Sequence, residues 1–219
     1  MDNLKSYREN EIKWYILAYL LLVVAVCFPN MIQGTDLDTA AKIEKLLVST
    51  ALSGAICTLT YVLDSIFSTQ MKDALLYLGF TKMPGSTVFT RIAGGKLNDK
   101  RIGKEKAKTS YASFVVGLSA NPKERRCQEN EKWYAIYSTH RDDKRVVAGN
   151  RDFLLCRDLY IATVIMTILT ATLWIAHLLP FKWIILGYLL LMLVVTNMAA
   201  HNKASRFVNT VIAVDLTKV

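Results

Sequence analysis

Cysteine, histidine and proline are scarce in this 219-residue chain, which has 4 Cys, 3 His and 4 Pro. The cysteines form no CxxC pair, and none of them lies near a histidine at the spacing of metal ligands. The sequence therefore predicts neither a disulfide framework nor a metal site. We interpret the four residues as small apolar side chains in a reducing compartment: Cys27, Cys57, Cys127 and Cys156.

Catalytic motifs are also missing. The chain contains no HExxH, no GxSxG, no paired-carboxylate motif, and no arginine four to seven positions before a histidine. Residues 94–96 (GGK) resemble a fragment of a phosphate-binding loop, but the full GxxxxGK[ST] pattern is absent, so we interpret them as a turn. These absences predict that the protein is not an enzyme and that it has no cofactor.

Long apolar stretches are present, and there are four of them. They run over residues 14–32, 46–67, 159–179 and 181–200. Each is close to the length of about 20 residues that a helix needs to cross a bilayer. Core helices of a soluble protein are the alternative, but such helices carry a polar face that these stretches almost lack. We therefore expect four transmembrane helices.

Basic residues are concentrated between the second and third stretches. Residues 68–158 hold 18 Lys+Arg against 10 Asp+Glu, whereas the whole chain has a net charge of +9. Because basic loops stay in the cytoplasm, we expect a multi-pass inner-membrane protein with this segment and both termini cytoplasmic. The predicted domains are residues 1–67 (N-terminal tail and two spans), 68–158 (basic domain), 159–200 (two spans) and 201–219 (C-terminal tail).

The basic domain is expected to combine helices with a little β-structure. Turn residues at Pro84–Gly85 and Gly94–Gly95 predict a short strand or hairpin between them, so the predicted fold class is a four-span helical bundle with a small mixed α+β domain inserted. Phe207, Val211 and Val214 fall at helical spacing, which predicts that the tail extends the last span and packs on the basic domain.

Hydroxyl and acidic side chains recur at helical spacing in the second and third stretches. They could hydrogen-bond neighbouring helices or line a wet path between subunits. Asp64 could be an interfacial carboxylate paired with Arg157, or part of a carboxylate ring at the inner mouth of a cation pore. The candidate pore-lining residues are Ser49, Ser53, Thr60, Asp64, Thr163, Thr167 and Thr170.

The basic domain carries two clusters of cationic residues with aromatic residues between them. Proximity to an anionic leaflet explains such clusters, at about 1 kcal/mol per basic residue. An anion site explains them too, because arginine binds phosphate with two hydrogen bonds and aromatic faces stack on bases. The candidate anion-binding or nucleotide-binding residues are Lys96, Lys100, Arg101, Lys104, Arg125, Arg126, Trp133, Arg141 and Arg145.

This order of apolar stretches around a basic insertion at residues 68–158 resembles, by architecture only, the small four-span membrane effectors of prokaryotic antiviral (anti-phage) defence systems. The resemblance implies an oligomer that permeabilises the inner membrane on a nucleotide or nucleic-acid signal. We therefore expect a homo-oligomeric channel or pore-forming effector, controlled by a nucleotide, an oligonucleotide or an acidic partner protein. The alternatives are a non-conducting scaffold that recruits a partner enzyme and a membrane enzyme that acts on lipid phosphates.

Overall fold

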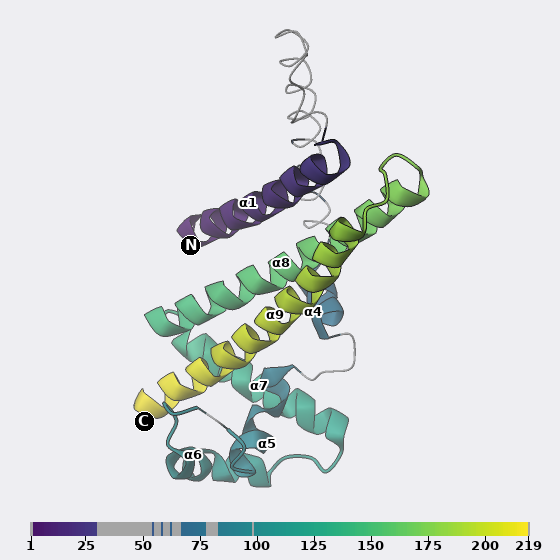
Figure 1. Cartoon of the computed structure of the whole chain (residues 1–219). Helices are drawn as coiled ribbons and strands as arrows, with labels where there is room; N and C mark the ends of the chain where they lie inside the picture. Colours follow the sequence, from purple (N-terminus) through teal and green to yellow (C-terminus); the bar gives the residue numbers. More distant parts are fainter. Residues whose placement is uncertain are drawn as a thin grey trace. The chain divides into compact units, whose positions relative to one another are not determined.

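The computed structural model describes residues 2–29, 54, 58, 62, 67–77, 83–97 and 99–218. Regular structure in these residues is helical throughout, and they include no strand. Figure 1 shows the elements in chain order: α1 (Asp2–Cys27), α4 (Thr69–Tyr77), the 3-10 helix η1 (Pro84–Thr87), α5 (Val88–Ala93), α6 (Lys104–Val116), α7 (Pro122–His140), α8 (Lys144–Ile175) and α9 (Trp183–Lys218).

The chain divides into two compact units. Unit 1 comprises Met1–Leu76 and Leu155–Ala199, and unit 2 comprises Tyr77–Leu154 and Ala200–Val219. The helices α8 and α9 each contribute residues to both units. The last part of the chain, which the sequence predicts to be a separate tail, thus belongs to the same unit as most of the basic segment.

Three helices in the described part of the chain are long and apolar enough to cross a membrane. Their candidate segments are Asn10–Cys27, Lys144–Ile175 and Trp183–Thr217. Large apolar side chains such as Leu21, Ile168 and Leu191 are exposed on these helices, as lipid-facing residues are. These features indicate a multi-pass membrane protein.

The predicted fold class is wrong in two respects. The described residues contain three candidate spans rather than four, and the predicted span at 46–67 lies almost wholly outside them. The expected strand or hairpin after Pro84 is instead η1 followed by α5.

A buried acceptor from another helix explains why the expected hairpin is helical. Glu129 of α7 is 1% exposed, and its Oε2 accepts the backbone N–H groups of Phe89 at 2.9 Å and Thr90 at 3.1 Å. Its Oε1 accepts the Thr90 hydroxyl. Amides in the first turn of a helix have no partner within the helix, so Glu129 caps α5 from 39 residues away. Local sequence patterns do not reveal such a partner.

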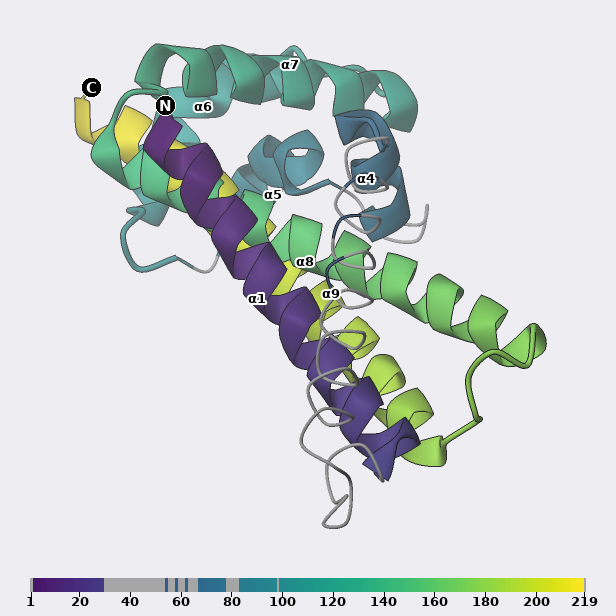
Figure 2. The same ribbon diagram turned by 90° about the horizontal axis from the view of Figure 1, so that it is seen from above.

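In unit 1, α1 runs parallel to α8. The hydroxyl of Tyr15 lies 2.8 Å from that of Thr163, and the hydroxyl of Tyr19 lies 2.5 Å from that of Thr170, so contacts advance along both helices together. The helix α9 then returns in the opposite direction, and its first half lies beside α1 (Figure 2). Their shared core includes Ile16, Leu20, Ala162, Met166, Ile185 and Leu189.

A left-handed residue ends α8. His177 has φ 57°, and the backbone N–H of Leu178 donates to the Leu173 carbonyl at 3.0 Å. A hydrogen bond from a residue to the carbonyl five positions earlier, with a left-handed residue just before the donor, is a common helix termination. Glycine is more common than histidine at the left-handed position. The ending lets the chain reverse over a few residues and begin α9 at Trp183.

In unit 2, helices surround the end of α9. The core contains Val88 and Phe89 from η1–α5, Trp133 from α7 and Val211 from α9. The prediction that the tail packs on the basic segment is confirmed, because Phe207, Val211 and Val214 are all buried here. Unit 2 holds 19 Lys+Arg against 9 Asp+Glu, whereas unit 1 holds 8 against 9, so the excess positive charge of the chain lies in unit 2.

Candidate functional site

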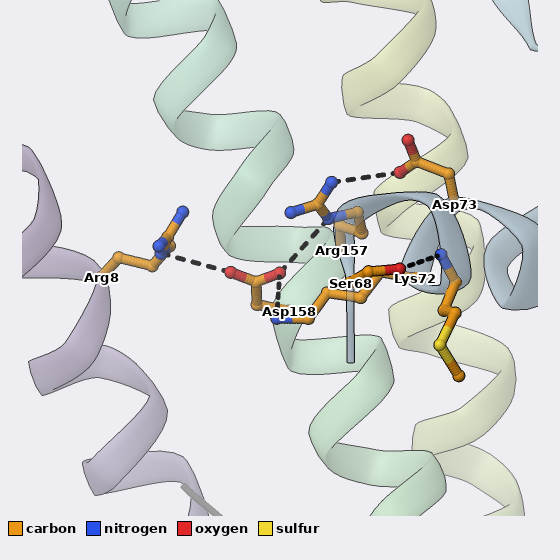
Figure 3. A network of polar contacts seen from close by, with 7 residues as sticks. Arg8, Ser68, Lys72, Asp73, Arg157 and Asp158 are labelled. Carbon is orange, nitrogen blue, oxygen red and sulfur yellow. Dashed lines mark hydrogen bonds and ion pairs between the residues drawn. The ribbon is translucent and has the colours of Figure 1, made fainter. Parts of the chain in front are cut away.

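Five charged side chains meet at one end of unit 1. Figure 3 shows them drawn from three helices: Arg8 from α1, Lys72 and Asp73 from α4, and Arg157 and Asp158 from α8. We call them the ion-pair cluster.

Asp158 is the centre of this cluster. Its carboxylate lies 3.2 Å from Arg8 Nε, 3.6 Å from Lys72 Nζ and 3.3 Å from Arg157 Nε. Arg157 also donates from a terminal nitrogen to Asp73 Oδ1 at 3.1 Å. The side chains of Asp158 and Arg157 are only 2% and 6% exposed, so these charges interact in a poorly solvated environment.

Local structure places the α4 residues of the cluster. The Ser68 Oγ accepts the backbone N–H of Met71 at 3.2 Å, which caps the start of α4. Lys72 and Asp73 follow in the next turn and reach α8. At its other end α4 is held to α9, since the Asn197 amide donates to the Leu76 carbonyl at 3.5 Å.

Mutual dependence is the main electrostatic property of the cluster. Three cations share two carboxylates, and burial leaves Lys72, Arg157 and Asp158 with little access to water, whereas Arg8 and Asp73 are partly exposed. Removing one partner from a buried ion pair costs about 3–5 kcal/mol, because the remaining charge stays buried without compensation. The cluster can therefore hold α1, α4 and α8 together. The described residues contain no group of ligands that could hold a metal ion.

The cluster also lies next to the unit boundaries in sequence. Asp73 precedes the boundary at residues 76 and 77, and Arg157 follows the one at residues 154 and 155. The end of α1 lies near Pro180, because Cys27 Sγ is 3.8 Å from the Pro180 carbonyl. The next described helix, α4, lies at the other end of unit 1, where its Lys72 contacts Asp158 of the ion-pair cluster. The residues that connect these points lie almost wholly outside the described part.

The described pore-lining candidates make hydrogen bonds within one chain. Thr163 and Thr170 are buried against Tyr15 and Tyr19, and Thr167 donates to the Thr163 carbonyl at 2.8 Å. Interhelical bonds of this kind contribute about 0.6 kcal/mol each in membrane proteins. These contacts fit the helix-pairing interpretation, and a lined path stays a prediction. The other four candidates lie outside the described residues: Ser49, Ser53, Thr60 and Asp64.

The anion-binding candidates are all in unit 2, and most are exposed. Trp133 is the exception: it is 5% exposed and stacks on Tyr137 with ring centroids 5.6 Å apart, so its face is occupied. Three arginines pair with nearby aspartates. Arg101 lies 2.7 Å from Asp99, Arg141 lies 3.8 Å from Asp142, and Arg145 lies 3.2 Å from Asp143. The remaining candidates are Lys96, Lys100, Lys104, Arg125 and Arg126, of which Arg125 is half-buried.

Sequence reasoning did not identify the ion-pair cluster. The available signal was two adjacent pairs of opposite charge, Lys72–Asp73 and Arg157–Asp158, placed where apolar stretches begin or end. A neighbouring pair of opposite charges at such a position can be buried together, whereas a single charge cannot.

Comparison with known proteins gives no relatives to set beside this geometry: no family model, no curated protein and no solved structure matches the chain.

Proposed function

We propose that this protein is an oligomeric inner-membrane channel or pore-forming effector, controlled by an anionic ligand that binds unit 2. The observation that carries the proposal is the continuity of α8 and α9. Each is a single helix with one part in the apolar unit 1 and another in the basic unit 2. A ligand that repacks unit 2 acts directly on helices that cross the membrane.

The ion-pair cluster supports this coupling. It joins α8 to α1 and α4 within a few residues of the point where α8 passes from unit 2 to unit 1. Buried charges that share partners can form ion pairs in only a few arrangements. If α8 shifts, its residues Arg157 and Asp158 therefore exchange one set of ion-pair partners for another in a discrete step. We propose that the cluster stabilises one state of the channel.

Charge and helix direction support a cytoplasmic unit 2. Unit 2 carries nearly all of the excess positive charge, which favours the cytoplasmic side. Arg8 bonds to Asp158, so the start of α1 lies at the end of unit 1 where α8 leads into unit 2. We therefore place the N-terminal residues, unit 2 and the end of α9 in the cytoplasm.

Packing in unit 1 supports an oligomer. Its described helices bury their facing side chains against one another, including Ile16, Ile161 and Ile185, which are almost completely inaccessible. Such a core leaves no aqueous path among the described helices, so we expect conduction along a path between copies. The architectural resemblance to anti-phage effectors suggests the biological setting, in which a nucleotide, an oligonucleotide or an acidic protein is the signal.

Ion flux through liposomes tests this proposal. Purified protein would be reconstituted, and dye release measured with ATP, tripolyphosphate, a short single-stranded RNA or no addition. We expect one of the anions to change the flux, and protein-free liposomes to show no change. Binding of these anions without any flux in correctly inserted protein would favour the scaffold alternative.

Asp158→Asn tests the coupling step in the same assay. The variant leaves Arg8, Lys72 and Arg157 sharing one fewer carboxylate, so flux should no longer follow the ligand while binding to unit 2 persists. Asp142→Asn is a matched control, because that side chain is 92% exposed and its one ion pair lies at the surface. Normal ligand response in Asp158→Asn would contradict the role of the cluster.

A further inference from the structure

The two basic clusters of unit 2 differ in how far acidic residues compensate them. Residues 96–108 contain six Lys+Arg and two Asp+Glu, whereas residues 123–145 contain seven Lys+Arg and five Asp+Glu. In the second cluster Arg141 and Arg145 each pair with a neighbouring aspartate, and α7 itself carries three glutamates. The first cluster is therefore the more strongly positive surface.

We propose that this first cluster is a binding site for phosphate groups, with Lys96, Lys100, Lys104 and Lys108 as its ligand-binding side chains. We call these four residues the lysine patch. This inference rests on the proposed function, of which it names the chemistry and the place of the controlling ligand.

The four lysines belong to the loop after α5 and to the first two turns of α6. Gly95 has φ 63°, and a Cβ at this position would lie 3.9 Å from Lys108 Nζ, so the ammonium group of Lys108 reaches the loop beside Lys96. Lys104 is on the same face of α6, one turn before Lys108. Lys96 and Lys100 are exposed on the loop itself. Among the described residues, Lys96, Lys100 and Lys104 have no ion-pair partner, and Lys108 lies 3.6 Å from Glu105.

The backbone beneath the patch is held in place. Leu97, Ile102 and Ala107 are buried in the core of unit 2 and fix the loop at both ends. Arg101 bonds to Asp99 with two side-chain nitrogens and donates to the Thr210 hydroxyl at 3.0 Å. A fixed loop presents its lysines with less loss of conformational entropy on binding.

Asp99 does not neutralise the lysines. Arg101 occupies both of its carboxylate oxygens, at 3.0 Å and 2.7 Å. This pairing is also the main reason that the pKa of Asp99 is lowered from its usual value. The one acidic residue in the loop is thus already compensated, and the positive potential of the patch remains.

The start of α6 adds a second reason to expect an anion. Lys104 and Lys106 lie in its first turn, where the helix dipole disfavours positive charge and Glu105 is the one acidic residue. The preceding Gly103 offers no side-chain acceptor to this turn. Lys106 donates to the Leu216 carbonyl at 2.6 Å and so has a structural role, but Lys104 has none in the described structure. A bound anion would offset the unfavourable placement of Lys104.

The composition of the patch favours phosphate over bases. Lysine binds phosphate as a point charge, without the flat fork that pairs with a base edge or stacks on a ring. Phe89 of α5 and Tyr111 of α6 pack on each other in the core of unit 2, where they present no face to a base. The ligand chemistry is therefore two or more phosphate groups, supplied by a free polyphosphate or nucleotide or by anionic phospholipid headgroups.

Binding measurements on the full chain in zwitterionic nanodiscs test the site. One arm titrates tripolyphosphate, and the other measures association with vesicles that contain phosphatidylglycerol. Substituting all four patch lysines by glutamine should weaken binding in at least one arm by about 1,000-fold, since each lysine near a phosphate surface contributes roughly fivefold. Loss in the first arm identifies a free phosphate ligand, and loss in the second arm identifies lipid.

Two matched variants complete the design. Glutamine at Lys123, Arg125, Arg126 and Lys144 removes the same charge from the other cluster and should change binding by less than about threefold, because residues 123–145 also contain five acidic residues. Arginine at all four patch positions keeps the charge and should keep binding. Equal weakening by both glutamine variants, or none by the patch variant, would overturn the proposal, as would binding of single-stranded RNA alone.

The binding readout separates this inference from the proposed function. Phosphate binding that depends on the patch but never alters flux would contradict the channel and leave the site intact. Ligand-dependent flux that survives in the patch glutamine variant would locate the controlling site elsewhere and overturn this inference alone.

Discussion

At the scale of single residues, the most consequential side chains are the buried ones that carry charge. Asp158 forms ion pairs with three cations. Glu129 accepts hydrogen bonds from two backbone amides and a hydroxyl. Neither belongs to a recognisable motif. Their roles follow from burial, because a charged group without water must find its partners within the protein.

Loss of the Asp158 charge should reduce stability strongly. Asp158→Asn keeps the size of the side chain but leaves the buried Lys72 and Arg157, and the partly exposed Arg8, short of a counter-charge. We therefore expect a loss of about 3–5 kcal/mol in the free energy of unfolding. Unfolding by denaturant in detergent, followed by circular dichroism, measures this. Asp142→Asn should change the value by less than about 0.5 kcal/mol. Equal effects of the two substitutions would show that the cluster contributes no special stability.

The phenol of Tyr111 should make unit 2 sensitive to alkali. Burial, reinforced by the carboxylate of Asp215 at 2.6 Å, raises the pKa of Tyr111 above its usual value of about 10. Above pH ~10 the unfolded phenol therefore loses its proton before the folded one, and stability falls as pH rises. We expect Tyr111→Phe to show a smaller fall in melting temperature across this range. An identical pH profile in both proteins would contradict this linkage.

At the scale of elements, helices α7 and α9 were predictable and α5 was not. The sequence predicts a helix at 123–139 with Trp133, Ile136 and Tyr137 on one face, and α7 buries the first two of these. It also predicts the apolar stripe at the end of α9. Each of those patterns lies within one continuous segment of the sequence. The helical conformation of α5 depends instead on hydrogen bonds to Glu129, which is distant in the sequence.

Removal of the Glu129 carboxylate should loosen α5 locally. Glu129→Ala leaves the amides of Phe89 and Thr90 without their acceptor, at about 1–3 kcal/mol for each buried group. Hydrogen exchange at these two amides should accelerate by about tenfold or more. Glu131→Ala, on the exposed side of the same helix, is the control. Unchanged exchange at Phe89 in Glu129→Ala would mean that α5 is held by packing alone.

At the scale of the whole molecule, the composition predicted membrane helices and a basic segment. The structure showed which helices contact one another and through which residues. The spans could be located because apolar runs of such length have few other uses. The ion-pair cluster could not, because its members lie up to 150 positions apart in the chain. The candidate anion-binding residues were predicted as two undivided clusters. The excess of basic over acidic residues that separates the clusters can be counted from the sequence, whereas the pairing of Arg101, Arg141 and Arg145 with nearby aspartates required the structure.

Cysteine labelling tests the proposed membrane orientation. Cys127 is free and exposed in unit 2, so it can be modified where it stands. A membrane-impermeant maleimide should label it in inverted inner-membrane vesicles and leave it unlabelled in intact cells. Leu178→Cys, at the exposed turn between α8 and α9, should show the reverse pattern when it is combined with Cys127→Ser. Labelling of Cys127 from outside intact cells would refute a cytoplasmic unit 2.

The position of α9 has a consequence for biosynthesis. The core of unit 2 includes Val208, Val211, Ile212 and Val214, which the ribosome makes about 60 residues after Val146, the last earlier residue of that core. The apolar parts of α8 and α9 lie between them. A nascent chain therefore exposes an incomplete core while its hairpin of apolar helices is being inserted. Unit 2 should mature only after insertion, which would delay its activity until the protein has reached the bilayer.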